Sequence, residues 1–177
     1  KAKKPDLKDL RKEYKMKKTL LIVLFITGFC FGQTYELAEE FYYNGFPKVI
    51  KTYKVSKGKI EIVKQVSWYD NGQKELERTY KDGKLNGKWT SWHDNGQKSS
   101  EVTYKDGKEE GLSTSWYENG QKWYEGTYKD GKSDGLWTYW YENGQKEKEG
   151  TYKDGKEDGL KTYWYWNGQK SYEVTYK

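Results

Sequence analysis

The chain offers few side chains that could carry out catalytic chemistry. His93 is its only histidine and Cys30 its only cysteine. A zinc site built from Cys and His therefore lacks ligands, and a Ser-His-Asp arrangement would have only His93 as its base, with no nucleophile elbow beside it. Tyr69 and Tyr117 stand 24 residues before and after His93. We therefore interpret His93 as a tyrosine substitute, and we predict no enzyme activity, no cofactor and no metal site.

Carboxylates recur in two columns at a spacing of 24 residues. The first column is Glu77, Glu101, Glu125, Glu149 and Glu173, and the second is Asp70, Asp94, Glu118 and Glu142, with Trp166 next in the series. Such columns could supply a glycosidase pair or a series of calcium ligands. The glycine-rich calcium patterns of β-rolls and EF-hands do not occur in the sequence, so we favour solvated carboxylates that face lysines.

Aromatic side chains are the strongest candidates for binding. Rows of rings can stack on sugars or hold quaternary ammonium groups, but rings that recur in every unit are expected to form the core of a thin sheet. Four tryptophans outside that regular column do not recur in every unit, and we predict that they are exposed and contact a partner. With three tyrosines of another column, the predicted binding residues are Trp89, Trp123, Trp137, Trp166, Tyr117, Tyr141 and Tyr165.

A tandem repeat must position these side chains. Asn-Gly-Gln-Lys begins at Asn71 and recurs every 24 residues to Asn167, and Thr-Tyr-Lys-Asp-Gly-Lys begins at Thr79 with the same spacing. Asn-Gly between aromatic-rich segments predicts a type I′ hairpin turn, with positive φ at both residues, and Asp-Gly predicts a second turn. The segments between them, such as residues 136–141, are rich in Thr and aromatic residues, as strands are.

We therefore predict an all-β fold, an elongated single-layer antiparallel meander of tandem hairpins preceded by a helical signal peptide. Alternation along each strand places Thr90, Trp92 and the later leucines on one face, and it places Gly87 near Tyr104 on the other. Stacked units bury one another's aromatic columns. The predicted structural repeat residues are Trp68, Trp92, Trp116, Trp140, Trp164, Tyr104, Tyr128, Tyr152, Gly96, Gly120, Gly144 and Gly168.

Composition supports a folded chain and argues against a nucleic-acid partner. Mean hydropathy is −1.24, but 18% of residues are aromatic, whereas disordered chains are poor in aromatic residues. Nine of the 33 Lys and Arg and three of the 27 Asp and Glu lie in residues 1–32, which leaves 24 of each sign in residues 33–177. The repeats thus lack the basic bias of a nucleic-acid-binding protein.

The N-terminal segment has the pattern of a signal peptide. Lys17 and Lys18 precede an apolar run over residues 20–31, which is shorter than the ~20 apolar residues that span a bilayer. We predict cleavage after Gly32 and export to the periplasm, the outer membrane or the medium. Because Phe29 precedes Cys30, we expect no lipid anchor, and the mature chain would have no cysteine. The predicted organisation is an upstream extension (1–15), a signal peptide (16–32), a degenerate capping repeat (33–66) and tandem repeats (67–177).

The repeat resembles a known family. The run Tyr124-Glu125-Gly126-Thr127-Tyr128, followed by Gly131 and Gly135, is similar to the MORN repeat, although the Glu-Gly pair is complete only here and at Glu149-Gly150. The recurrent Asn-Gly-Gln-Lys resembles the bacterial MORN-variant branch, whose members are often labelled antitoxins. The resemblance covers about residues 41–177. It implies an elongated antiparallel sheet with scaffold, dimerisation or lipid-headgroup-binding roles.

We predict an exported, non-enzymatic repeat scaffold or binding module whose partner is a protein or a cell-envelope component. One alternative is an aromatic-column binder of a carbohydrate or a choline-type ligand. The other is the antitoxin component of a toxin–antitoxin system, which a signal peptide argues against because the toxin would be cytosolic. A glycan or a lipid headgroup remains open as the ligand, and the open edges of the sheet would allow a homodimer.

Overall fold

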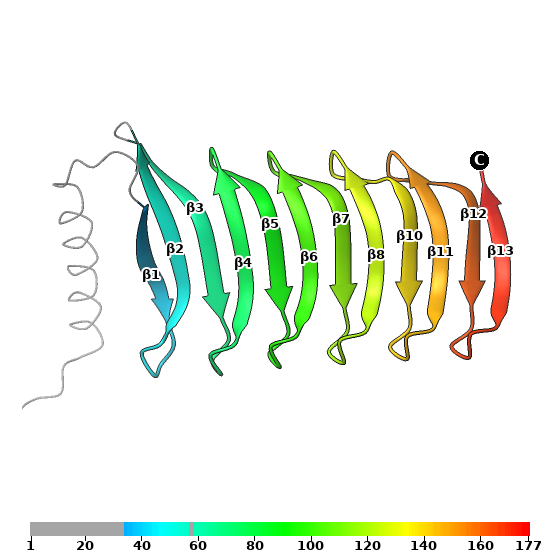
Figure 1. Cartoon of the computed structure of the whole chain (residues 1–177), viewed down its shortest axis with the longest axis horizontal. Coiled ribbons are helices and arrows are strands. Elements are labelled where there is room, and N and C mark those ends of the chain that lie inside the picture. Colours follow the sequence, from blue (N-terminus) through cyan, green and yellow to red (C-terminus); the bar gives the residue numbers. More distant parts are fainter. Residues whose placement is uncertain (1–33, 57–58) are drawn as a thin grey trace, which may run out of the picture. The chain divides into compact units, whose positions relative to one another are not determined.

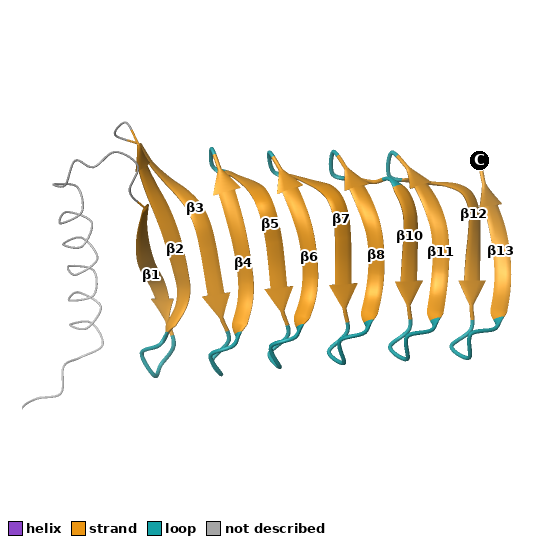
Figure 2. Ribbon diagram, viewed as in Figure 1, coloured by secondary structure: helices purple, strands orange, loops and turns teal. Residues whose placement is uncertain are grey.

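The computed structural model describes residues 34–56 and 59–177, which form a single open antiparallel sheet of 13 strands in a meander. The strands follow one another across the sheet in chain order (Figure 1), and turns lie at both ends of the strands (Figure 2). This confirms the predicted all-β meander. The predicted signal peptide and upstream extension lie outside the described residues. Within the described ranges, no helix is long and apolar enough to cross a membrane.

The strands alternate in direction between two kinds of turn. Their bounds are β1 Thr34–Phe41, β2 Pro47–Ser56, β3 Lys59–Trp68, β4 Lys74–Lys81, β5 Lys84–Trp92, β6 Lys98–Lys105, β7 Lys108–Trp116, β8 Lys122–Lys129, β9 Lys132–Ser133, β10 Gly135–Trp140, β11 Lys146–Lys153, β12 Lys156–Trp164 and β13 Lys170–Tyr176. Both β9 and β10 pair with β8. Together they take the place that a single strand, such as β7, takes in the neighbouring repeat.

The Asp-Gly turns are two-residue loops. Asp82 and Gly83 have φ angles of 50° and 77°, and they connect the paired residues Lys81 and Lys84. Positive φ at both central residues is the signature of the type I′ turn, whose twist matches that of the flanking strands. The same geometry recurs in the later repeats, where each Asp-Gly pair has positive φ.

The Asn-Gly turns are different, and the prediction of type I′ geometry for them was wrong. Of the two residues only Gly72 has positive φ, at 84°. The Gly72 N–H donates to the Tyr69 carbonyl at 3.1 Å and the Tyr69 N–H donates to the Gln73 carbonyl at 2.8 Å, which defines a three-residue loop ending in a glycine bulge. The Asn71 side-chain oxygen accepts the Gln73 N–H at 2.9 Å, and this local bond favours a conformation without positive φ at Asn71.

Contacts between successive Asn-Gly turns hold neighbouring repeats together. The Tyr69 hydroxyl donates to the Trp92 carbonyl of the next repeat at 2.8 Å, and the Asn71 amide donates to the Asp94 carbonyl at 2.7 Å. His93 makes the equivalent contact through its ring, with Nε2 2.9 Å from the Trp116 carbonyl oxygen. The interpretation of His93 as a tyrosine substitute is confirmed. The Asn-Gly turns that make these contacts lie in a row at the lower ends of the strands in Figure 1.

The sheet has two faces, which we name after their threonine and tyrosine columns. The threonine face carries Thr90, Thr114, Thr138 and Thr162, and the tyrosine face carries Tyr104, Tyr128 and Tyr152. Gly87 pairs with Tyr104 as predicted. In the described part of the chain, Val49, Val102 and Trp137 are the only apolar side chains classed as buried. In this single-layer sheet, side chains are thus buried by contact with neighbouring side chains on the same face.

Candidate binding surfaces

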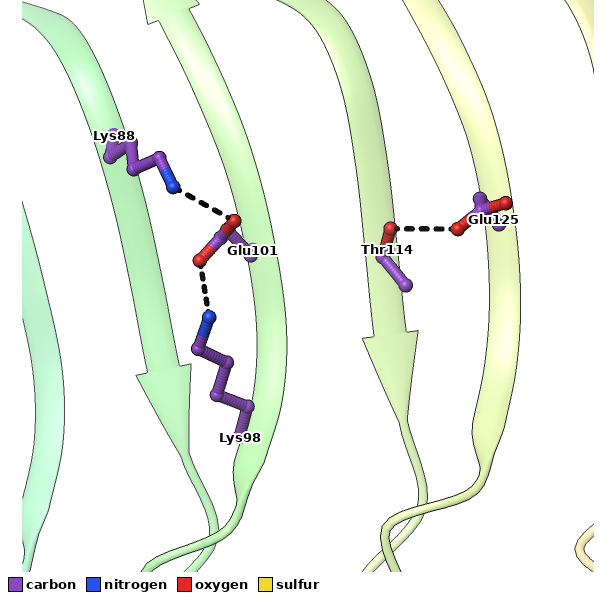
Figure 3. Close-up of polar contacts among 5 residues, drawn as sticks. All are labelled: Lys88, Lys98, Glu101, Thr114 and Glu125. Carbon is purple, nitrogen blue, oxygen red and sulfur yellow. Dashed lines mark hydrogen bonds and ion pairs between the residues drawn. The ribbon is translucent and has the colours of Figure 1, made fainter.

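The threonine face carries a repeated network of lysine, glutamate and threonine. Lys98 and Lys88 contact the two carboxylate oxygens of Glu101 at 2.7 and 3.1 Å, and Thr114 donates to Glu125 at 3.4 Å (Figure 3). The hydrogen bond from Lys98, together with that from Lys88, outweighs partial burial and lowers the pKa of Glu101. The Lys–Glu contact three residues apart recurs in every later repeat. These glutamates are therefore held by lysines, as we interpreted them.

The same lysines approach the tryptophan column of the threonine face. Lys74 Nζ lies 5.3 Å from the centroid of the Trp92 ring while also contacting Glu77. Because Glu77 pairs with Thr90 across the strands, Trp92 and Thr90 share a face, as predicted. Equivalent lysines lie 5.4–5.9 Å from the centroids of the next three column rings, those of Trp116, Trp140 and Trp164. The column tryptophans are half-buried. The ammonium groups of these lysines lie near their rings and would compete with a ligand for contact with them.

Glutamates and aspartates do not assemble into a metal site in the described ranges, where no group of three or more metal-ligating side chains is found. The first-column carboxylates are spaced two strands apart, about 10 Å along the sheet. Each one contacts lysine instead of a second carboxylate. The carboxylates of the threonine face are therefore neutralised by lysines, in an arrangement that repeats along the sheet.

The tyrosine face carries a continuous group of rings over β8, β10 and β11, which we call the aromatic band. Its members are Tyr117, Trp123, Tyr124, Tyr128, Trp137, Tyr139 and Tyr152. Trp137 lies at its centre, with ring centroids 5.0 Å from Tyr128, 5.7 Å from Tyr124 and 6.1 Å from Tyr152. Trp123 extends the band through edge contact with Tyr124 at 5.4 Å. Ring pairs at these separations and angles are favourable beyond their buried area.

Trp137 is not an exposed contact ring, and that prediction was wrong. Only 3% of its surface is exposed, because its ring lies over Gly126 of the neighbouring strand. A Cβ added at Gly126 would lie within 2.5 Å of three ring atoms of Trp137. The indole N–H donates to the Thr127 carbonyl at 3.2 Å. The complete Glu-Gly pair of this repeat thus provides the space that a flat ring needs on the sheet.

Trp123 keeps the exposed position that the sequence predicted. It sits at the bulge that follows the Asn-Gly turn, 47% exposed, with its ring 6.2 Å from Tyr117. Elsewhere in the band, burial raises the pKa values of Tyr128 and Tyr139 to about 12. Both phenols therefore stay neutral at physiological pH. The surface around Trp123 is mainly aromatic, with the charge of Glu147 close to Tyr117 and Tyr139.

The lysines at the C-terminal side of the band mark its limit. Lys148 Nζ lies 4.3 Å from the Tyr139 ring centroid. Lys161 occupies the position of Trp137 one repeat later, buried over Gly150 and bonded to Glu157. Burial is the largest single influence and opposes its charge, but the hydrogen bonds to Glu157 and Tyr163, together with the electrostatic interactions with Tyr152 and Tyr163, outweigh it and raise the pKa of Lys161. On the tyrosine face the central indole of the band is thus replaced, one repeat later, by a buried lysine paired with Glu157, and rings resume with the stacked pair of Tyr163 and Tyr172.

The other predicted binding residues are not brought together. Trp89 is half-buried on the tyrosine face opposite Val102, and Trp166 is 72% exposed at the last turn. Tyr141 donates its hydroxyl to the Trp164 carbonyl at 2.8 Å, and Tyr165 is exposed at its turn.

Sequence reasoning missed Tyr124 and Tyr139, which pair across β8 and β10. The signal for them was present, because Tyr139 lies two residues from Trp137 and so shares its face. The pairing of Tyr124 with Tyr139 follows once the register of the hairpins is known.

The fold and its spacing define a tandem β-hairpin repeat protein. The model of the MORN repeat variant family matches residues 63–82, 85–106, 109–130 and 133–154. The chain therefore belongs to the MORN repeat variant family, and this supports a repeat module that binds a protein or a membrane.

Two further comparisons add little to this assignment. No curated protein matches the chain. Among solved structures, the chain is similar to a point mutant of S. aureus TarM in complex with fondaparinux, alpha-GlcNAc-glycerol and UDP, at 13% identity and a TM-score of 0.27. The match covers 80% of this chain and 23% of TarM, so the chain spans less than a quarter of that protein. A TM-score this low does not establish a common fold.

Proposed function

We propose that the chain is an exported, non-enzymatic binding module whose partner, a protein or another cell-envelope component, docks on the aromatic band. The observation that supports this most directly is Trp123, an exposed ring that packs against Tyr117 and Tyr124, of which Tyr124 stacks on the buried Trp137. Aromatic residues of this kind are enriched at the centres of interfaces. Packing by neighbouring rings reduces the side-chain entropy that Trp123 would lose on binding.

The test compares two exposed tryptophans. Isolated envelope fractions are incubated with the full chain, with Trp123→Ala and with Trp166→Ala, and retention is measured. Trp166 is the matched control because it is more exposed but lies at the last turn, away from the band. We expect Trp123→Ala to weaken retention about tenfold or more, as loss of an interface hot spot does, and Trp166→Ala to leave it unchanged. Equal retention of both variants would contradict docking on the band.

Export is the second part of the proposal. The signal-peptide pattern of residues 16–32 supports it. Cell fractionation followed by intact-mass analysis should find a chain of residues 33–177 in the periplasm, outer membrane or medium. A cytosolic chain that retains residues 16–32 would contradict export, and the antitoxin function would then become the better proposal.

A carbohydrate ligand on the tryptophan column is the alternative with an observation in its favour. The column rings recur every second strand, about 10 Å apart, which is close to the length of two sugar rings in an extended glycan. The lysines near these rings argue against stacking, because a sugar would have to displace them. Retention on insoluble glycan that Trp116→Ala abolishes would support this alternative over the aromatic band.

A further inference from the structure

The first repeat departs from the others at the tryptophan column. Val49 pairs with Ser67 in the first repeat, and Leu76 pairs with the equivalent Ser91 in the next. Val49 and Leu76 are therefore equivalent. Pro47, two residues before Val49, takes the position of Lys74, two residues before Leu76. The lysine that stands near each later column ring is therefore replaced by proline next to Trp68.

A hollow of about 350 Å³ lies at this position. Its lining residues come from the first two Asn-Gly turns: Asn44, Phe46, Pro47, Trp68, Tyr69, Asp70, Asn71 and Gly72. Phe46 stands where later repeats have glutamine, and it does not fill the same space. A Cβ added at Gly96 would lie 2.8 Å from the Gln73 oxygen, whereas one added at Gly72 would meet nothing within 4 Å.

We infer that this hollow, the Trp68 hollow, binds a trimethylammonium group such as that of choline. In the later repeats a lysine ammonium group lies near the indole ring, at 5.3 Å in the case of Lys74 and Trp92, where it is also paired with Glu77. In the first repeat Ile50 takes the position of that glutamate, so the surroundings of Trp68 are more apolar. Trp68 has the same place in the fold but no lysine of its own at that position. The hollow lies outside the aromatic band, so the inference does not depend on the proposed partner.

The lining favours a methylated ammonium over a primary one. The walls formed by Phe46, Pro47 and Trp68 are apolar and cannot accept the three hydrogen bonds of a primary ammonium group. A trimethylammonium group has no N–H to satisfy and is attracted to the faces of aromatic rings. Asp70 adds one carboxylate at the rim, which complements the positive charge.

The first experiment follows the Trp68 indole N–H signal of the full chain by NMR during titration with choline chloride, with the signal assigned through Trp68→Phe. We expect a saturable shift. The neutral isostere 3,3-dimethylbutanol should bind about 2- to 30-fold more weakly, which is the range a cation–π contact supplies. Equal binding of the neutral isostere would overturn the proposal.

Two substitutions test the site without removing the ring. Pro47→Lys places a cationic side chain beside Trp68, which should obstruct the hollow and repel choline, and so abolish the choline-induced shift. Asp70→Asn should weaken binding by up to about fivefold, as expected for an exposed charge pair. Asp94→Asn, the same change one turn later, is the matched control and should have no effect. An unchanged choline affinity in folded Pro47→Lys would refute the inference.

The source of the group is distinguished with vesicles. Retention on phosphatidylcholine vesicles but not on phosphatidylglycerol vesicles, lost in Pro47→Lys, would assign the Trp68 hollow to a lipid headgroup. A choline-induced shift without vesicle retention would assign it to free or polymer-attached choline. The absence of both would overturn the proposal.

Discussion

Replacing Gly126 with alanine tests how the aromatic band is built. The added Cβ would lie within 2.5 Å of three Trp137 ring atoms, and the ring cannot move without weakening the 3.2 Å bond to the Thr127 carbonyl and the contact with Tyr128. Overpacking of this kind costs about 1–3 kcal/mol in unfolding free energy. With a urea m-value of about 1–3 kcal/mol/M, the unfolding midpoint should fall by about 1 M.

Gly150→Ala is the matched control. Gly150 is the equivalent glycine one repeat later, but its neighbour is the flexible side chain of Lys161, whose Cγ would lie 2.9 Å from the new Cβ. The lysine stem can shift, so we expect a cost of about 0–1 kcal/mol. The assay is urea unfolding followed by far-UV circular dichroism and tryptophan fluorescence.

A double-mutant cycle separates the Trp137 contact from other effects. In a Trp137→Ala background, Gly126→Ala should cost less than about 0.5 kcal/mol, because the ring it would strike is gone. The reasoning would be refuted if Gly126→Ala were as stable as the native chain, if Gly150→Ala cost more, or if the cost persisted without Trp137.

The remaining predictions concern the turns, titration and burial. His93→Tyr should keep the hydrogen bond to the Trp116 carbonyl and leave thermal stability unchanged or raised. His93→Phe removes this bond and should lower the free energy of unfolding in urea by about 0.5–1.5 kcal/mol. Equal stability of the two variants would contradict a structural role for the bond. Because burial raises the folded pKa of Tyr128 and Tyr139 to about 12 from 10.0, their contribution to stability is complete below pH 10 and is lost as pH rises from 10 towards 12. The melting temperature measured between pH 9 and 12 should therefore fall, and less so in Tyr128→Phe; an equal fall in that variant would count against the assignment. Trp137→Ala should cost about 3–5 kcal/mol, and Trp123→Ala less than about 1 kcal/mol in the same assay, whereas similar losses would mean that Trp123 is structural.

The fold was predictable because every repeat carries its own turn signals. The 24-residue spacing of Asn-Gly and Asp-Gly fixed the number and order of the hairpins, and the residue alternation placed Gly87 beside Tyr104. The prediction of turn types was wrong for the Asn-Gly turns, because Asn and Asp act differently here than expected. The Asn71 side chain binds the backbone two residues on, and Asp82 adopts the left-handed conformation instead.

The candidate site was only partly predictable. Non-recurring tryptophans pointed to Trp123 and Trp137, but recurrence alone could not separate an exposed ring from a buried one. That distinction depends on the residue across the strand, since Gly126 leaves room for Trp137 to lie flat. The Trp68 hollow could not be predicted, because it forms where the first repeat lacks a lysine. The first repeat differs in length from the others, so the equivalence of Pro47 and Lys74 is evident only from the strand register.

Site-specific photo-crosslinking in the cells that produce the protein tests the central proposal most directly. A photoreactive phenylalanine analogue is placed at Trp123 in one variant and at Trp166 in another. Docking on the aromatic band predicts one discrete envelope-associated adduct from position 123 and none from position 166. Adducts from position 166 alone, or the same adducts from both positions, would contradict the proposal.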